Sequence, residues 1–182
     1  SGFSIAQYML ISGGISGSGN LTLAGNGAVS TGNDGGKSLR NGILISGPVS
    51  TTGSIINSGT GKALVQISGA ISNAAGGVTQ DSATSRLTLS SANTYTGATN
   101  VNAGVLRITN STAISTSSAV NVAAGATLQF TGNAASPNTA QILTLSGHGT
   151  DYSSGALESV TTGAYLGNVV LAADTTFAGS FA

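Results

Sequence analysis

The residues that could carry out acid/base or metal chemistry in this chain of 182 are few and far apart. The acids are Asp34, Asp81, Asp151, Glu158 and Asp174, and no two of them are closer than seven positions. The single histidine, His148, could act as the general base of a catalytic triad, but no matching nucleophile loop accompanies it, so we interpret it as a turn residue. Cysteine is absent, which excludes a thiolate nucleophile and a cysteine-ligated zinc. We therefore predict no enzyme activity and no catalytic, cofactor-binding or metal-binding residues.

Two other segments have features of ligand sites. The segment Asn33-Asp34-Gly35-Gly36 resembles part of a calcium-binding nonapeptide repeat. Calcium sites of that type need several copies and the chain has one, so we predict a turn here. Tyr95 has the flat ring that could stack on a sugar, but its place in a repeated pattern indicates packing between structural repeats.

Charge and hydropathy narrow the class of protein further. Only 5% of the residues are charged, and the net charge is zero. The sequence shows no run of Lys or Arg that would neutralise phosphates, so we expect no nucleic-acid partner. No apolar stretch approaches the roughly 18 residues of a membrane-spanning helix, so we expect no membrane insertion by this segment. Because 40% of the residues are hydrophobic, we expect a folded chain although about half of it is Gly, Ser, Thr and Asn.

Short alternating apolar runs, each closed by Gly, Asn or Ser, recur along the chain and predict β-strands. They lie at 21–23, 43–45, 64–67, 87–89, 105–108, 120–122, 128–130, 142–145 and 169–171. Without the run at 120, their starts are about 21 positions apart on average, and periods of roughly 20 to 50 residues are typical of solenoids. The predicted fold class is all-β: a single-stranded parallel β-helix (β-solenoid) of about 8 to 9 coils, with residues 1–182 as one domain. Val, Ile and Leu should point inward, Thr, Ser and Asn outward, and Gly and Asn should form the corners.

One segment carries a specific resemblance. Residues 86–108 read RLTLSSANTYTGATNVNAGVLRI. This segment closely resembles the passenger-associated transport repeat, also called the autotransporter-associated β-strand repeat. The positions in register with the family pattern are Leu87, Thr88, Leu89, Ala92, Asn93, Thr94, Tyr95, Thr96, Gly97, Thr99, Val101, Asn102, Ala103, Gly104, Leu106 and Arg107. Ser91 and Ala98 stand where the family commonly has glycine.

The resemblance implies a right-handed β-helical fragment of a longer autotransporter passenger, exported through the outer membrane to the cell surface or exterior. Such repeats are associated with secretion, so the expected function is a noncatalytic stalk or scaffold that supports secretion and display. A role as an adhesin stays open, and its ligand is not indicated by the sequence. Two alternatives also stay open: a self-stacking subunit of an extracellular filament or surface layer, and a polysaccharide-active β-helical enzyme.

The distribution of charge suggests a partner. The net charge is +2 over residues 1–62, +1 over residues 63–150 and −3 over residues 151–182. The exposed edges of a β-helix can pair with further strands. We therefore expect further coils of the same parent chain, or identical copies, to continue the stack head to tail, with opposite charges favouring that polarity.

Overall fold

The computed structural model describes residues 8–27, 42–114, 116–133, 141–151, 155–160 and 167–179. All the regular structure in these residues is β-strand, and none of it is helix. Every strand pair recorded among them is parallel. The prediction of an all-β parallel β-solenoid is therefore confirmed.

The strands form three faces of a column. Face 1 contains β1 (Tyr8–Ile11), β4 (Gly42–Ile45), β7 (Val65–Ile67), β9 (Leu87–Leu89), the second half of β10 (Thr99–Asn110), β12 (Ala126–Asn133), β14 (Leu157–Ser159) and β16 (Phe177–Gly179). Face 2 contains β3 (Leu21–Leu23), β6 (Ile55–Asn57), β8 (Val78–Asp81), the first half of β10, β11 (Val120–Val122), β13 (Leu143–Gly147) and β15 (Val169–Thr175). Face 3 contains β2 (Ile15–Gly17) and β5 (Val49–Thr51), and it continues to Ile71 through a single bridge.

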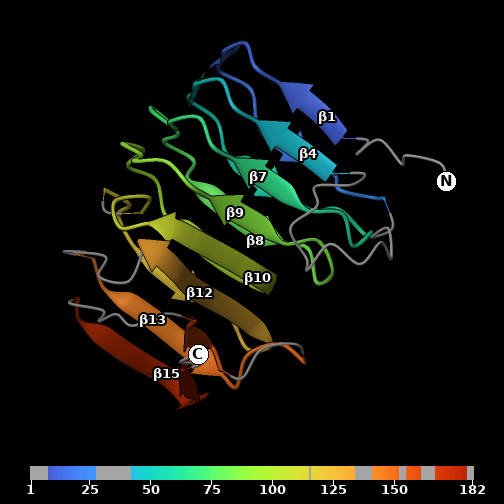
Figure 1. Ribbon diagram of the computed structural model, residues 1–182. Helices are drawn as coiled ribbons and strands as arrows, with labels where there is room; N and C mark the ends of the chain where they lie inside the picture. The colour runs from blue at the N-terminus through green and yellow to red at the C-terminus, as the bar shows by residue number, and fades with distance from the viewer. Residues whose placement is uncertain are drawn as a thin grey trace, which may run out of the picture.

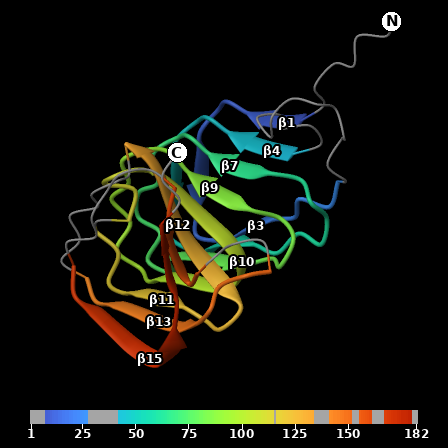
Figure 2. The same cartoon turned by 60° about the horizontal axis from the view of Figure 1, so that its bottom comes forward.

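The strands of face 1 follow one another in chain order along the length of the column, from blue β1 to orange β12 (Figure 1). Seen from the turned view, β11, β13 and β15 occupy a different side of the column from β7 and β9 (Figure 2). Each layer between the two ends is thus hydrogen-bonded to the layers on both sides of it.

Alternation within each strand separates the interior from the surface. In β9, Leu87 and Leu89 are fully buried, whereas Thr88 between them is half-buried on the outer side. The partners of Leu87 in the neighbouring layers are Val65 and Leu106, so like residues stack on like along the column. The predicted inward aliphatic side chains are confirmed for this face. The predicted outward hydroxyl side chains are not, because the outward positions level with Thr88 hold Leu44, Gln66, Arg107 and Gln129.

The expected number of coils was too high. The solenoid has about five turns, fewer than the 8 to 9 coils expected. Coils differ in length: Met9 pairs with Ile43, 34 positions on, whereas Leu87 pairs with Leu106 after only 19. Dividing the chain by a uniform 21 residues therefore overestimates the coils, because long connections at some corners use residues without adding a layer.

The predicted series of strand starts also mixed two faces. The starts at 43, 64, 87, 105 and 128 fall on face 1, whereas those at 21, 142 and 169 fall on face 2. Both switches of face shortened a step. The starts at 21 and 43 are 22 positions apart where the coil takes 34, and those at 128 and 142 are 14 apart where the coil takes 29.

Glycines allow the coils to stack closely at the corner after β4 and β7. A methyl group on Gly69 would lie 1.8 Å from the carbonyl oxygen of Gly47, and one on Gly47 would lie 1.9 Å from the carbonyl oxygen of Gly13. At Gly13, by contrast, a methyl group would meet no described atom within 4 Å. This corner therefore requires glycine at positions 47 and 69, which lie between coils, and tolerates a side chain at position 13 in the first layer.

Candidate functional site

The segment at 86–108 makes one turn of the solenoid. It starts in β9 on face 1, crosses to face 2 at Thr99 and returns to face 1, where Leu106 pairs with Leu87. The long strand β10 bends around the corner between the two faces, where Gly104 has a positive φ of 63°. A methyl group at Gly104 would also lie 2.1 Å from the carbonyl oxygen of Ser82, so this corner requires glycine on both grounds.

The side chain of Asn93 adds hydrogen bonds between coils on face 3, at a position where the structure has no strand. Its Oδ1 accepts a hydrogen bond from the backbone N–H of Ile71 at 2.9 Å, and its Nδ2 donates to the carbonyl oxygen of Ala113 at 2.8 Å. Ile71 belongs to the preceding coil and Ala113 to the following one, and Asn93 itself is buried. One amide side chain thus joins three successive coils, and it does so beside the backbone hydrogen bond of 2.8 Å from the N–H of Thr94 to the carbonyl oxygen of Ile71.

Tyr95 lies in the interior of the column. Its ring is fully buried, and its hydroxyl shares a hydrogen bond of 2.7 Å with Thr99 Oγ1. Thr99 Oγ1 donates to Ser117 Oγ at 2.9 Å, and Ser117 Oγ lies within hydrogen-bonding distance of the carbonyl oxygens of Gly97 and Ala119. Burial raises the pKa of Tyr95 above its usual value, and the hydrogen bond to Thr99 offsets part of this rise. The ring is therefore a packing element, as interpreted from the sequence, and it offers no face to a sugar.

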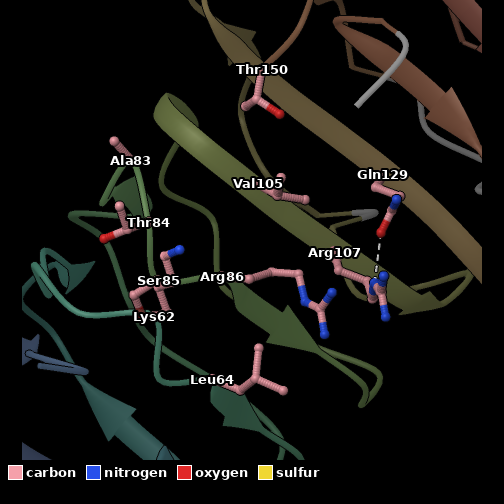
Figure 3. Close-up of a pocket in the computed structure, with 10 residues that line it drawn as sticks. All are labelled: Lys62, Leu64, Ala83, Thr84, Ser85, Arg86, Val105, Arg107, Gln129 and Thr150. Carbon is pink, nitrogen blue, oxygen red and sulfur yellow. Dashed lines mark hydrogen bonds between the residues drawn. The ribbon is translucent and has the colours of Figure 1, made fainter. Parts of the chain in front are cut away.

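A basic groove lies on the outer side of face 1, over the same turn. It is a hollow of about 320 Å³ whose lining includes Lys62, Arg86 and Arg107. Arg86 directly precedes β9, and Arg107 is in β10 one layer further on. The two guanidinium groups lie beside each other in the groove, and no other residue drawn separates them (Figure 3).

Burial and mutual repulsion weaken the basicity of Arg86. Burial and, to a smaller degree, the charge of Arg107 lower the pKa of Arg86 from 12.5 to about 10. Its Nε is buried and has no hydrogen-bond partner among the described residues. The pKa of Arg107 is also lowered by burial, an effect that the carboxylate of Glu158 partly opposes. With a pKa of about 10, Arg86 remains charged at neutral pH.

A side-chain relay connects Arg107 to Glu158 across two layers. Arg107 Nε donates to Gln129 Oε1 at 2.6 Å, and Gln129 Nε2 donates to Glu158 Oε2 at 2.6 Å. The three residues occupy consecutive paired positions on β10, β12 and β14. Glu158 is 7% exposed. The acid therefore stabilises Arg107, whereas Arg86 has no comparable partner in the described structure.

A buried polar cluster fixes the backbone just before Arg86. The carbonyl oxygen of Ser85 accepts hydrogen bonds from Asn57 Nδ2 at 2.9 Å and from Gln80 Nε2 at 2.8 Å. Ser85 Oγ donates to the carbonyl oxygen of Ala63 at 2.7 Å. Because these groups are buried, the position of Arg86 on the groove wall is set by the interior of the column.

The other candidates from the sequence do not form a catalytic site. His148 is exposed between two glycines with positive φ, and its Nδ1 shares a 2.7 Å hydrogen bond with the hydroxyl of Thr176, where a triad would need a carboxylate. Asp81 and Asp174 are exposed on face 2, Asp151 is exposed in a turn, and Glu158 is buried on face 1. In the part of the chain that the structure describes, no three acids or histidines could hold a metal ion. The segment Asn33–Gly36, with Asp34, lies outside the described residues.

Comparison with known protein families gives a match to the turn that contains Asn93, Tyr95 and both arginines. Residues 84–108 match the family model of the passenger-associated-transport-repeat. This turn is similar to a passenger-associated transport repeat. The resemblance stated for residues 86–108 is thus confirmed, and such repeats are typical of autotransporter passenger domains. No curated protein and no solved structure matches the chain.

The repeat has consequences for localisation. Passenger repeats imply secretion through the outer membrane to the cell surface or exterior, in agreement with the sequence-based expectation. The match identifies no catalytic family. In the described residues, no helix is long and apolar enough to cross a membrane.

Sequence reasoning missed the basic groove. It treated Lys62, Arg86 and Arg107 as scattered charges because they are 24 and 21 positions apart. Those separations are close to one coil length, so a solenoid brings the three residues to the same side of the column. Reading the charges against the coil period would have found the cluster.

Proposed function

We propose that this chain is a noncatalytic structural module, a stalk or scaffold segment of an autotransporter passenger that supports secretion and display. The observation that carries the proposal is the use of the repeat's own polar residues. Asn93, Tyr95 and Thr99 are buried and hydrogen-bonded within or between coils, so the repeat acts in holding the column together. A right-handed winding is part of the proposal, supported by the strong preference of parallel crossovers for that hand.

Surface display tests this function. Cells that produce the parent passenger with Asn93→Ala should show less passenger at the surface than cells with the unchanged protein, because coils that fail to join fold poorly during export. The control variant is Asn121→Ala, which removes only an exposed hydrogen bond to Asn100 of 2.9 Å. Equal surface amounts for Asn93→Ala and the unchanged passenger would contradict the proposal.

Self-stacking into a filament is a second candidate function, favoured by the edge layers. At one end of the column, β1 exposes Met9 by 61% and Leu10 by 51%; at the other, β15 exposes Leu171 by 56% and β16 exposes Phe177 by 55%. Apolar edge strands of this kind pair readily with further strands. We propose that further coils of the parent chain occupy these edges and that identical copies do so in the filament alternative. Of the charges that suggested a head-to-tail polarity, Asp34, Lys37 and Arg40 lie outside the described residues.

Electron microscopy and light scattering separate the two candidates. Single rods at high protein concentration, with no dependence on salt, support the stalk. Long uniform fibres whose formation weakens with salt support the filament. The third alternative, a polysaccharide-active enzyme, predicts depolymerisation of an acidic glycan that is lost on replacing one of the acids. A screen of uronic-acid polymers without turnover would remove this alternative.

A further inference from the structure

The basic groove contains an arginine whose Nε takes no part in joining the coils. Backbone ladders, buried side chains such as Asn93, and the relay from Arg107 through Gln129 to Glu158 join the coils, whereas Arg86 Nε has no hydrogen-bond partner among the described residues. Arg86 and Arg107 are on the outer side of face 1 and line a hollow of about 320 Å³. Hollows of roughly 300 Å³ and more are of the size that holds small ligands.

The positive charge in the groove is only partly compensated. Glu158 reaches Arg107 through Gln129, but Arg86 has a buried Nε without a partner among the described residues. Two adjacent guanidinium groups present several N–H donors in a forked arrangement that suits the oxygens of a carboxylate, sulfate or phosphate. A bound anion would satisfy these donors and relieve the repulsion between the arginines.

The surroundings of Arg86 favour a ligand that also has an apolar side. In the ladder of face 1, Arg86 is level with Leu64 in the layer before and with Val105 in the layer after. Both are half-buried and line the hollow, and the hydroxyl-bearing Thr84 and Thr150 are also part of the lining. A sugar ring has this combination of apolar C–H groups and hydroxyl groups.

The groove extends beyond a single ring. A second hollow of about 280 Å³ shares Ala83 and Thr150 with the first and continues toward the corner at Gly104. Asp151 lines this second hollow, so it repels an acidic group there and directs it toward the arginines. None of the residues lining either hollow is aromatic, which disfavours the base stacking of single-stranded nucleic acid.

We propose that this groove binds an acidic polysaccharide, with one carboxylate of a uronic-acid unit held between Arg86 and Arg107. Lys62 lies at the same hollow and adds attraction at longer range. Binding requires no reaction, so the proposal differs from the enzyme alternative. Neither does it depend on whether the module serves as a stalk or forms filaments.

Calorimetric titration of the purified 182-residue chain tests the proposal. The probes are oligogalacturonate, inorganic phosphate, a neutral dextran oligomer and a polyglutamate peptide. We expect oligogalacturonate to bind and dextran not to bind. Because both guanidinium groups hold the carboxylate, Arg86→Met and Arg107→Met should each weaken oligogalacturonate binding at least tenfold, and Arg86→Lys should have an intermediate effect because it keeps the charge and loses the fork.

Controls distinguish a site from general charge attraction. Asp174→Asn changes the net charge at an exposed position of face 2, away from the hollows, and should leave the affinity unchanged. Thermal unfolding followed by circular dichroism should show that Arg86→Met is folded, since this change removes a buried charge.

Four outcomes would overturn the proposal. The first is an absence of oligogalacturonate binding, and the second is binding that Arg86→Met does not weaken. The third is phosphate binding as tight as that of the oligomer, which would assign the groove to a free oxyanion. The fourth is binding of polyglutamate in preference to oligogalacturonate, which would assign it to an acidic peptide.

Discussion

Replacing Asn93 by alanine should weaken the solenoid where three coils meet. In the unchanged chain, the side chain of Asn93 is hydrogen-bonded to the backbone N–H of Ile71 at 2.9 Å and to the carbonyl oxygen of Ala113 at 2.8 Å. The substitution leaves both backbone groups without these partners. A buried group that loses its partner costs about 1 to 3 kcal/mol, so the loss of two partners should lower the free energy of unfolding by about 2 to 6 kcal/mol. For a chain of this length, that corresponds to a drop in melting temperature of roughly 4 to 24 °C.

Replacing Asn93 by aspartate separates the two hydrogen bonds. The acid keeps an acceptor for the N–H of Ile71 but, when ionised, places an oxygen against the carbonyl oxygen of Ala113. Burial and this repulsion should raise the pKa of the new carboxyl in the folded chain above the value of about 3.9 for a free aspartate. The folded state then binds the proton more tightly than the unfolded state, so Asn93→Asp should be strongly destabilised at pH 7 and regain stability as the pH falls toward 4.

Urea unfolding followed by far-ultraviolet circular dichroism measures both effects. Asn121→Ala is the matched control. It removes the hydrogen bond between Asn121 and Asn100, which is similar in length to the bonds of Asn93 but lies on the solvent-facing side of face 2. We expect this control to lose less than about 1 kcal/mol. The reasoning fails if Asn93→Ala is no less stable than the control, or if Asn93→Asp is equally destabilised at pH 4 and pH 7.

Three further changes test the interior, a corner and the groove. Tyr95→Phe removes the buried hydrogen bond to Thr99 and should cost about 1 to 3 kcal/mol in the same urea assay; no change would show that this bond contributes nothing. Gly69→Ala should cost about 3 kcal/mol or more because its methyl group meets the carbonyl oxygen of the adjacent coil, whereas Gly13→Ala should change stability by less than about 0.5 kcal/mol; equal effects would refute the close stacking. Arg86→Met should raise the free energy of unfolding at pH 7 by on the order of 1 to 3 kcal/mol, since the pKa of Arg86 is lowered to about 10 in the folded chain. Below pH 10 Arg86 is charged in the folded chain, and its burial lowers the free energy of unfolding. Above pH 10 the folded arginine loses its proton before the unfolded one does, so the difference in stability between Arg86→Met and the unchanged chain should shrink. A difference that grows above pH 10 would contradict this assignment.

The local strand pattern could be predicted from the sequence because it depends on neighbouring residues. The run Leu87-Thr88-Leu89 alternates between interior and surface, and the structure places it in β9 as expected. Which face each strand joins depends instead on the number of residues in each corner. The 34 positions between Met9 and Ile43 show how far that number can vary, and alternation within strands holds no information about it.

The roles of the polar residues were predicted only in part. A corner or packing position for Tyr95 followed from its place in the repeat and is confirmed. The bonds of Asn93 to Ile71 and Ala113 could not be predicted, because they depend on the alignment of three coils. The groove was missed for a different reason: Arg86 and Arg107 are neighbours only across layers, and their separation of 21 positions indicates this only when it is compared with the coil length.

The contrast between Asn93 and Arg86 bears on what the module does besides fold. The contacts of Asn93 are with residues 22 positions before it and 20 after it, so each requires the closure of only one coil, and the coils can join one after another as the chain emerges. The backbone of Arg86 accepts a hydrogen bond from the N–H of Val65, but its side-chain Nε has no partner among the described residues, and burial of the guanidinium beside another cation opposes folding. Its outward neighbours on face 1, Leu64 and Val105, show that the column accommodates apolar side chains at equivalent positions. Since folding would be served better by such a residue, the charge at Arg86 is more consistent with binding an anion than with a structural role.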